Sequence, residues 1–434
     1  MLLRFTVQNF RSIYEPQALL MRASKLKDDP QPLSARIAGK DEQVLPTAGI
    51  FGANASGKSN LLKGLGLMRH MILHSHKDGE IEGRLPHEPF RLSPHAKHEP
   101  TRFELELFLS GTRYLYGFCY NTSQILEEWL YAYPTHARQV WFHRKHDEDP
   151  SFYFGKYLKG HNKRTEEITR KNSLFLSAAA MNNHEQLTTL YHALRDRLIT
   201  AGMEDFPLSP RALDAYEQDD NLRVWATQFL RAAATGVMEL QVVDSTPEVP
   251  ERLRKEWETL REKLGKETHF ETRQIQLTHR GQGQEPVAFE THLESRGTRT
   301  LLRLLGPVHQ VLQQGGTLIV DELNSSLHPL LSTRLVQLFT NPTHNPHAAQ
   351  LLFSTHDATL LRLSHLRRDS IWLTEKSREG MTQLIALSDF KVRAEADRET
   401  LYLHGHFGGV PWLTTEEDIW SPLHSHTSPK TEGA

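Results

Sequence analysis

The sequence predicts an α/β protein in which a buried parallel sheet is combined with an antiparallel β-subdomain and a helical insertion. Three short apolar runs end in glycine or polar residues, as buried parallel strands do: "TAGIFG", "GGTLIVDE" and "QLLFSTHD". Between Phe103 and Phe154, aromatic and β-branched runs are separated by turn residues, which is typical of antiparallel strands. From about Asn172 to Lys266 the apolar residues follow helical spacing.

The order of these segments predicts four parts of the chain. We expect an N-terminal lobe over residues 1–171, a helical insertion over 172–285, a C-terminal lobe over 286–413 and a polar tail over 414–434. The N-terminal lobe begins with the alternating strand "LLRFTVQNF". The tail is expected to be disordered because it is polar. A short arm is predicted within the insertion, where heptad spacing relates Leu253, Trp257, Leu260 and Leu264.

Charge, cysteine content and hydropathy exclude several classes of protein. The 51 Lys and Arg residues nearly balance the 53 Asp and Glu residues, so any basic face for nucleic acid must be local. The single cysteine, Cys119, excludes a disulfide framework and fits a reducing compartment. No apolar run approaches the roughly 20 residues that span a bilayer, and the N-terminus lacks the build of a signal peptide. We therefore expect a cytoplasmic protein with no membrane partner.

A phosphate-binding loop (P-loop) is predicted at residues 52–59. The stretch "GANASGKS" matches the pattern G-x-x-x-x-G-K-[ST] between a predicted strand and a predicted helix. Glycines let successive N–H groups face phosphate oxygens, the lysine reaches the β- and γ-phosphates, and the next hydroxyl holds Mg²⁺. The alternative is a glycine turn that only resembles the pattern, and the flanking strand and helix disfavour it. The residues predicted to bind ATP are Gly52, Asn54, Ala55, Ser56, Gly57, Lys58, Ser59 and Asn60, with Ser59 also a Mg²⁺ ligand.

Three polar residues after later apolar runs are candidates for hydrolysis. Asp321 and Glu322 end "TLIVDE", where Asp321 can hold a Mg²⁺-bound water and Glu322 can polarise the attacking water. His356 ends "LLFSTH" further along the chain. A histidine at a strand end is more often a polar cap, but its position after the acidic pair favours a contact with the γ-phosphate or the attacking water. We therefore predict Glu322 and His356 as catalytic residues.

This succession of motifs resembles the ATPase heads of the ABC, SMC and RecF group. The resemblance implies that Ser295, Gly297 and Thr298, in "LESRGTRTLLRLLGPV", bind the γ-phosphate held by the opposite subunit. Arginine replaces the first glycine of the transporter motif L-S-G-G-Q here, although a hydroxyl and an open helix N-terminus are kept. The stretch "NSSLHP" occupies the place of the loop that crosses the dimer interface. "NFRS" is similar to the start of SMC and RecF heads, which implies that Arg11 approaches the nucleotide.

A finer resemblance is to the small SMC-like ATPases of bacterial phage defence, the AbiLi or RloA type of abortive-infection protein. It is carried by "EPFRL", "NSLFLSAAAMNN", "SDFKVR" and "YLHGHFGGVP". It implies an ATP-switched sensor or scaffold that works with a separate effector protein. It also implies a head-to-tail homodimer, which can assemble further, with two ATP molecules between the heads. Such proteins often have glutamine near Met181 as a sensor of Mg²⁺ and γ-phosphate; this chain has Asn182 and Asn183 there.

Other functions stay open. A RecF- or SMC-like DNA-binding ATPase in DNA repair or maintenance would need a continuous basic face. The chain offers one basic run, diluted by Glu166 and Glu167 and made of Lys156, Lys159, Lys163, Arg164, Arg170 and Lys171. This run can contact DNA or RNA, but a solvated loop is the favoured interpretation. A transporter ATPase would need the L-S-G-G-Q motif, and a module that holds ATP without hydrolysis is disfavoured by Glu322.

Two further sites are disfavoured on composition. A metal-dependent nuclease domain of the Toprim type would need more chain than follows His356 and an acidic cluster such as D-x-D, so we expect none. His70, His74 and His76 include the four-residue spacing of metal ligands. The chain has 25 histidines, so chance grouping at an exposed helix end is the better interpretation.

Overall fold

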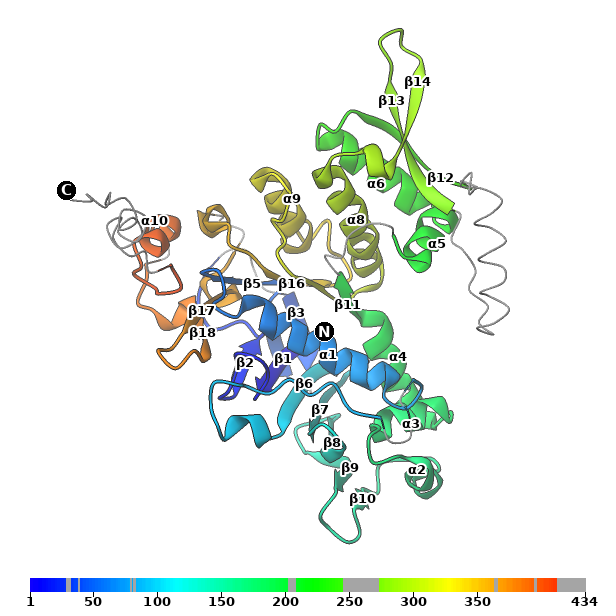
Figure 1. Cartoon of the computed structure of the whole chain (residues 1–434), viewed down its shortest axis with the longest axis vertical. Helices are drawn as coiled ribbons and strands as arrows, with labels where there is room; N and C mark the ends of the chain where they lie inside the picture. The colour runs from blue at the N-terminus through cyan, green and yellow to red at the C-terminus, as the bar shows by residue number, and fades with distance from the viewer. Residues whose placement is uncertain are drawn as a thin grey trace, which may run out of the picture.

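The larger lobes are organised around a six-stranded, mainly parallel sheet (Figure 1). The computed structural model describes residues 1–28, 33–37, 40–78, 80, 83–201, 208–244, 273–362, 366–393 and 396–411. The strand order is β11 (Leu198–Ala201), β15 (Thr317–Val320), β16 (Gln350–Ser354), β5 (Thr47–Gly52), β17 (Ile371–Lys376) and β18 (Thr382–Ala386). Neighbours are parallel except β18, which pairs antiparallel with β17. The three apolar runs of the sequence are therefore neighbours, with β16 between β5 and β15.

The predicted antiparallel β-subdomain is confirmed as a seven-stranded sheet. Its order is β10 (Phe152–Phe154), β9 (Gln139–Lys145), β8 (Ile125–Tyr133), β7 (Thr112–Tyr120), β6 (Thr101–Leu109), β1 (Leu2–Gln8) and β2 (Gln17–Leu20). Every neighbouring pair is antiparallel. The N-terminal strand belongs to this sheet because its alternate residues face the subdomain core, where the Phe5 ring stacks on Phe103 at 6.2 Å.

Helix α1 (Lys58–His74) packs between the two sheets. Its residues Leu61, Leu65 and Met68 share one core with Phe5 of the antiparallel sheet and Leu352 of the parallel sheet. A second core covers the other face of the parallel sheet, under α8 (Arg296–Gln314) and α9 (Pro329–Thr340). The parallel sheet is therefore buried on both faces, which explains why its strands are continuous apolar runs.

The remaining elements are attached to this frame. The helices α2 (Asn162–Ile168), α3 (Phe175–Met181) and α4 (Glu185–Arg197) follow the antiparallel sheet. The helices α5 (Pro210–Gln218) and α6 (Asp220–Ala232) pack on α8, and α10 (Arg398–Leu403) lies near the C-terminal end. A two-stranded sheet is formed by β3 (Leu33–Ile37) and β4 (Lys40–Val44).

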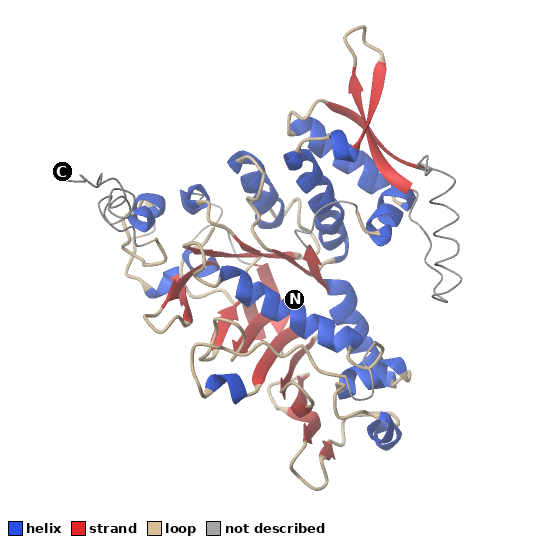
Figure 2. Ribbon diagram, in the orientation of Figure 1, coloured by secondary structure: helices blue, strands red, loops and turns tan. Residues whose placement is uncertain are grey.

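The helical prediction for residues 172–266 is wrong in two places. The strand β11 lies inside this range and joins the parallel sheet, and β12 (Val237–Asp244) lies there too. With β13 (Arg273–Arg280) and β14 (Pro286–Glu290), β12 forms an antiparallel sheet that projects beside α6 (Figure 2). The error has a physical reason: β12 is stabilised by pairing with β13, about 30 residues away, which local periodicity does not reveal.

Two sequence predictions concern residues that the structure does not describe, and a third concerns membrane-spanning helices. The heptad residues Leu253, Trp257, Leu260 and Leu264 and the tail 414–434 lie outside the described residues. None of the helices in the described part of the chain combines the length and apolarity that crossing a bilayer requires.

The side chain of Gln350 connects the two sheets. It is fully buried. Its Nε2 donates to the carbonyl oxygens of Leu2 (3.0 Å) and Leu45 (3.1 Å). Its Oε1 accepts from the Leu2 N–H (2.6 Å) and the Thr317 hydroxyl (3.1 Å). One amide therefore satisfies polar groups from β1, β15 and the chain before β5.

We expect Gln350→Leu to lower the free energy of unfolding by about 2–4 kcal/mol, because buried polar partners lose their hydrogen bonds. Urea unfolding followed by circular dichroism measures the change. The control Gln383→Leu, at an exposed position of β18, should stay within about 0.5 kcal/mol of the wild type. Equal losses in the two variants would show that the buried amide has no special role.

Candidate nucleotide-binding site

The P-loop lies between β5 and α1, as the motif requires. Gly52 (φ 153°) and Gly57 (φ 108°) both have positive φ. A Cβ atom at Gly57 would lie 2.1 Å from the Thr382 Oγ1, and one at Gly52 would lie 2.4 Å from the Thr374 Oγ1. Only glycine fits at these positions, so the backbone can form the curled loop that phosphate binding needs.

The other predicted residues of the loop differ in their exposure to solvent. Ser56 is buried, and its Oγ lies 2.6 Å from the Thr374 Oγ1. Asn54 and Ala55 are exposed at the tip of the loop, and Ala55 has a left-handed backbone (φ 61°). Ser59 and Asn60 are half-buried in the first turn of α1. The exposed tip and the helix start therefore surround the place that a phosphate chain would occupy.

Lys58 lies over its own loop. Its side chain is 7% exposed, and its Nζ donates to the carbonyl oxygens of Gly52 (2.7 Å) and Ala53 (2.9 Å). Burial lowers the pKa of Lys58, while the negative charges of Glu322 and Asp321 act in the opposite direction. The structure therefore brings the predicted phosphate-binding lysine within electrostatic reach of both predicted acidic residues.

The acidic pair is held by the neighbouring strand β16. The Ser354 hydroxyl donates to the Asp321 Oδ1 (2.5 Å) and accepts from the Glu322 N–H (2.8 Å). Glu322 has a left-handed backbone (φ 53°) and an exposed side chain. This conformation is rare for a residue with a Cβ atom and is found mainly where the surrounding structure enforces it. It turns the chain sharply at the strand end and leaves the Glu322 carboxylate free to meet a ligand.

His356 follows β16 and is oriented by Asn324. The Asn324 Nδ2 lies 3.0 Å from the His356 Nε2, and the Asn324 Oδ1 accepts from the Thr355 hydroxyl (2.8 Å). The Asn324 amide therefore connects the Thr355 hydroxyl to the His356 ring. Asn324 belongs to "NSSLHP", so the predicted interface loop and the predicted catalytic histidine are in direct contact.

The predicted signature residues are located at the start of α8. The exposed Ser295 caps this helix by accepting from the Thr298 N–H (3.1 Å). A Cβ atom at Gly297 would lie 2.9 Å from the carbonyl oxygen of Ser326, in the loop after β15. Among the described residues, no hydrogen bond or ion pair joins Ser295 or Thr298 to the P-loop of the same chain. Within one chain the structure does not bring the signature residues and the P-loop together.

Arg11 is directed at a carboxylate. Its Nε and Nη2 donate to the Glu88 carboxylate at 2.8 and 3.3 Å. The neighbouring Ser12, which was not predicted, lies closer to the loop. Its Oγ accepts from the Asn60 Nδ2 (2.7 Å) and lies 2.7 Å from the Thr382 Oγ1. The turn "NFRS" therefore contacts the start of α1 through Ser12, and the approach of Arg11 to the nucleotide stays a prediction.

Two threonines that sequence reasoning missed support the P-loop. Thr382 on β18 is buried, and its hydroxyl donates to the carbonyl oxygen of Ser56 (2.8 Å). Thr374 on β17 contacts the Ser56 hydroxyl and donates to the carbonyl oxygen of Phe51 (3.2 Å). Threonine in a strand is ordinary, so no motif marks these residues. Only the pairing of β17 with β5 places them beneath the loop.

We expect Thr382→Val to raise the KM for ATP about tenfold with kcat within about threefold, because the loop backbone loses its anchor while the reacting groups are untouched. Steady-state ATPase kinetics measure both constants. Thr382→Ser keeps the hydroxyl and is the matched control. A fall in kcat with an unchanged KM would contradict a role in positioning the loop.

The stretch "YLHGHFGGVP" also packs against the P-loop strand. Gly408 (φ 69°) and Gly409 (φ 70°) form a left-handed turn. The Tyr402 hydroxyl donates to the carbonyl oxygen of Gly409 (3.0 Å), and a Cβ atom at Gly409 would lie 3.7 Å from the Gly52 Cα. One of the stretches singled out only by resemblance is thus a neighbour of the candidate site.

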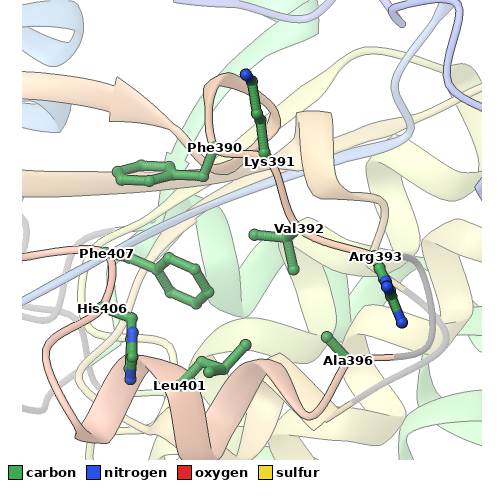
Figure 3. A pocket seen from close by; sticks show the side chains of 8 residues that line it. All are labelled: Phe390, Lys391, Val392, Arg393, Ala396, Leu401, His406 and Phe407. Carbon is green, nitrogen blue, oxygen red and sulfur yellow. The ribbon is translucent and has the colours of Figure 1, made fainter.

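A separate cavity of about 540 Å³ lies between α10 and the loop before it (Figure 3). Six of its lining residues belong to "SDFKVR" and "YLHGHFGGVP", and Ala396 and Leu401 lie between these stretches. Val392, Leu401 and Phe407 form an apolar centre, while Lys391 points away from the cavity. None of the P-loop residues, Asp321, Glu322 or His356 lines this cavity, so we assign it no part in the nucleotide site.

The remaining predicted residues have local partners. Asn182 ends α3, and its Nδ2 donates to the carbonyl oxygen of Ala178 (2.8 Å). The His74 Nδ1 lies 2.6 Å from the Asp78 Oδ2, and the His76 Nδ1 lies 3.3 Å from the Ser173 Oγ. In the part of the chain that the structure describes, no group of three His, Cys, Asp or Glu side chains is placed to hold a metal ion.

The P-loop, the acidic pair and His356 follow three neighbouring parallel strands, β5, β15 and β16, which is the arrangement of a P-loop nucleotide-binding domain. The chain belongs to the family described as "AAA domain, putative AbiEii toxin, Type IV TA system", which matches residues 48–362. No curated protein matches the sequence.

Three solved structures are similar over most of the chain. An SMC head bound to the C-terminal winged-helix domain of ScpA is 10% identical, with a TM-score of 0.40 and 89% of this chain and 97% of that chain covered. The SMC head domain from Thermotoga maritima is 12% identical (TM-score 0.38; 89% and 98% covered). An SMC head with an extended coiled coil, bound to the C-terminal domain of ScpA derived from Pyrococcus furiosus, is 11% identical (TM-score 0.37; 89% and 97% covered).

Proposed function

We propose that this protein binds ATP with Mg²⁺ and hydrolyses it to ADP and phosphate where β5, β15 and β16 end. The observation that carries the proposal is the convergence of three groups on one edge of the sheet. The negative charges of Glu322 and Asp321 raise the pKa of Lys58 against the effect of burial. Ser354, on the strand that leads to His356, forms hydrogen bonds to both acidic residues. A phosphate cradle, an acidic pair and an imidazole are what phosphoryl transfer to water requires.

Each residue has a distinct role in this proposal. The P-loop N–H groups and Lys58 bind the phosphates, for which the Lys58 Nζ exchanges its carbonyl partners for phosphate oxygens. Ser59 and Asp321 would hold Mg²⁺, which supplies positive charge to the phosphates when bound. Glu322 accepts a proton from the water that attacks the γ-phosphorus. The bond between the γ-phosphorus and the oxygen that bridges the β- and γ-phosphates breaks, and ADP leaves. His356, held by Asn324, donates from its other ring nitrogen or contacts the γ-phosphate.

The complete site requires a second copy of the chain. Ser295 caps an exposed helix start, and neither Ser295 nor the buried Thr298 has a hydrogen bond or ion pair to the P-loop of its own chain in the described residues. In a head-to-tail dimer, this helix start of one copy would face the γ-phosphate bound by the other. Loss of that phosphate would then break charge-assisted hydrogen bonds across the interface and let the heads separate.

At the level of the cell, we propose a nucleotide-switched sensor or scaffold in an anti-phage system of the AbiLi or RloA type, with a separate effector protein. The family description, which names a toxin of a toxin–antitoxin system, supports a place among defence systems. The packing of "YLHGHFGGVP" on Gly52 supports the resemblance, because one of its four stretches is adjacent to the P-loop.

A RecF- or SMC-like role in DNA repair is the second candidate, and the contacts of the basic run weaken it. Lys163 pairs with Glu166 (3.0 Å), and Arg170 donates to the carbonyl oxygen of His76 (2.8 Å). Two of the six cations are therefore engaged within the chain and are less available to a nucleic-acid backbone.

Two assays test the proposal in order. The purified chain should release phosphate from ATP, and the release should stop when EDTA removes Mg²⁺. Plating of phage on cells that carry the gene and its genomic neighbours should then show protection that Lys58→Ala abolishes. No hydrolysis would exclude the enzyme, whereas hydrolysis without protection would exclude only the defence role.

A further inference from the structure

A second cavity is lined by arginines and lies away from the P-loop. It measures about 610 Å³ and is lined mainly by α1, α4, α5 and α8. Each of these helices contributes one arginine to the lining: Arg69, Arg195, Arg211 and Arg303. Arg69 is eleven residues beyond Lys58, so the cavity lies about 16 Å along α1 from the phosphate loop. Its volume is typical of sites for small ligands.

The positive charge of this cavity is only partly balanced. Arg195 forms a bidentate pair with Asp196 at 2.8 and 2.9 Å. The Arg69 Nη2 donates to the carbonyl oxygen of Arg195 (2.8 Å), but the Arg69 Nε is buried and has no hydrogen-bond partner. Arg211 is exposed and makes no hydrogen bond or ion pair within the described residues. Burial lowers the pKa of Arg69 and the charge of Arg211 lowers it further, so these two guanidinium groups repel each other, while the negative charge of Asp196 acts in the opposite direction.

The remaining lining suits a ligand with several acceptor oxygens. Gln310, Gln313 and Gln314 of α8 also line the cavity. Tyr216 is buried, and its hydroxyl donates to the carbonyl oxygen of Leu302 (2.7 Å), so its ring forms part of an apolar wall. The acidic Asp219 also lines the cavity, 3.7 Å from the His309 Nδ1. Donors therefore outnumber charged acceptors in this lining.

We propose that this cavity binds a small ligand that carries two or more phosphate groups, at a site separate from the P-loop. Guanidinium groups are suited to this because their planar donors bind phosphate oxygens in pairs. An anion would also relieve the repulsion between Arg69 and Arg211 and give the buried Arg69 Nε a partner. Polyphosphorylated nucleotides have the matching chemistry and size.

The position of the cavity connects it to both halves of the proposed ATP site. Helix α1 begins at Lys58 and α8 begins beside Ser295, and a ligand here would touch both. Pro307 of α8 lines the cavity and removes one helical hydrogen bond, which weakens α8 at the point of contact. An influence of this ligand on ATP hydrolysis rests on the proposed function, whereas the binding of the ligand to the cavity does not.

Calorimetric titration of the full chain with inorganic triphosphate tests the binding. All titrations use protein that carries Lys58→Ala, because this change weakens triphosphate binding at the P-loop. The result for the cavity is then independent of the proposed ATPase activity. Replacing Arg69 and Arg211 together with glutamine should weaken triphosphate binding at least tenfold. The matched control replaces Arg91 and Arg378, two exposed arginines outside the cavity lining, and should stay within twofold.

A stability measurement separates a binding role from a structural one. If the arginines serve a ligand, the Arg69/Arg211 variant should keep or raise its thermal midpoint, because two repelling charges are removed. Three outcomes would overturn the proposal. Triphosphate does not bind, it binds equally to the Arg69/Arg211 and Arg91/Arg378 variants, or a single-stranded DNA 15-mer binds although triphosphate does not. Glu204 and Asp205 precede Arg211 in the sequence and lie outside the described residues. The proposal would also be overturned if triphosphate bound only to a variant that carries Glu204→Gln and Asp205→Asn.

Discussion

The variant Glu322→Gln is expected to hydrolyse ATP at least a hundredfold more slowly than the wild type while binding ATP within about twofold. Glutamine has nearly the shape of glutamate, and the backbone N–H of residue 322 keeps its bond to Ser354. The amide cannot accept the proton of the attacking water. Chemistry is therefore lost and binding is kept, which single-turnover hydrolysis and equilibrium binding of labelled ATP measure separately.

The same variant is expected to accumulate as an ATP-bound dimer, because the γ-phosphate that joins the two heads is not removed. Light scattering after size exclusion, with and without ATP, measures the mass. Glu15→Gln, at an exposed position of the chain before β2, is the matched control and should behave as wild type. Wild-type hydrolysis in Glu322→Gln would remove Glu322 from the mechanism, and a monomer in ATP would argue against the shared site.

Mixing two inactive variants is expected to restore activity. Lys58→Ala removes the phosphate-binding ammonium, and Ser295→Arg blocks the start of α8, so each variant alone should be inactive. In a mixed head-to-tail dimer, the intact P-loop of one copy meets the intact signature of the other. Random pairing makes half of the dimers mixed, each with one of two sites, so about a quarter of the wild-type rate should return.

The expected recovery depends on which variants are combined. Mixing Lys58→Ala with Glu322→Gln is the control, because both residues belong to the same half-site of a chain. Each site of the mixed dimer then carries one defect, and no activity should return. Combining both changes in one chain, Lys58→Ala with Ser295→Arg, and mixing it with wild type should give no complete site in a mixed dimer. Ser295→Arg that is fully active alone would refute the role of the signature residues.

Much of the candidate site was predictable because its residues follow local patterns. A glycine before a lysine, and acidic residues after an apolar run, are visible within eight residues of sequence. The structure adds that Asp321 and Glu322 share Ser354 and that His356 contacts Asn324. These contacts join residues about 30 positions apart, so periodicity does not predict them.

Other parts were predicted incompletely for the same reason. The segment 172–266 has helical spacing, yet β11 and β12 lie in it because each pairs with a strand far away in sequence. Arg11 matches a family motif, but its guanidinium is paired with Glu88. A motif specifies which residue is present, whereas its partner depends on how the chain packs.

By itself the sequence determined the α/β class, the antiparallel β-subdomain, the P-loop and the positions of Glu322 and His356, because hydrophobic periodicity and short motifs are local properties. Only the tertiary structure decided that β16 lies between β5 and β15, that Thr374 and Thr382 support the P-loop, and that four arginines from four helices line one cavity. These features depend on contacts between residues distant in the chain, where the free energy of packing, and not local propensity, selects the neighbours.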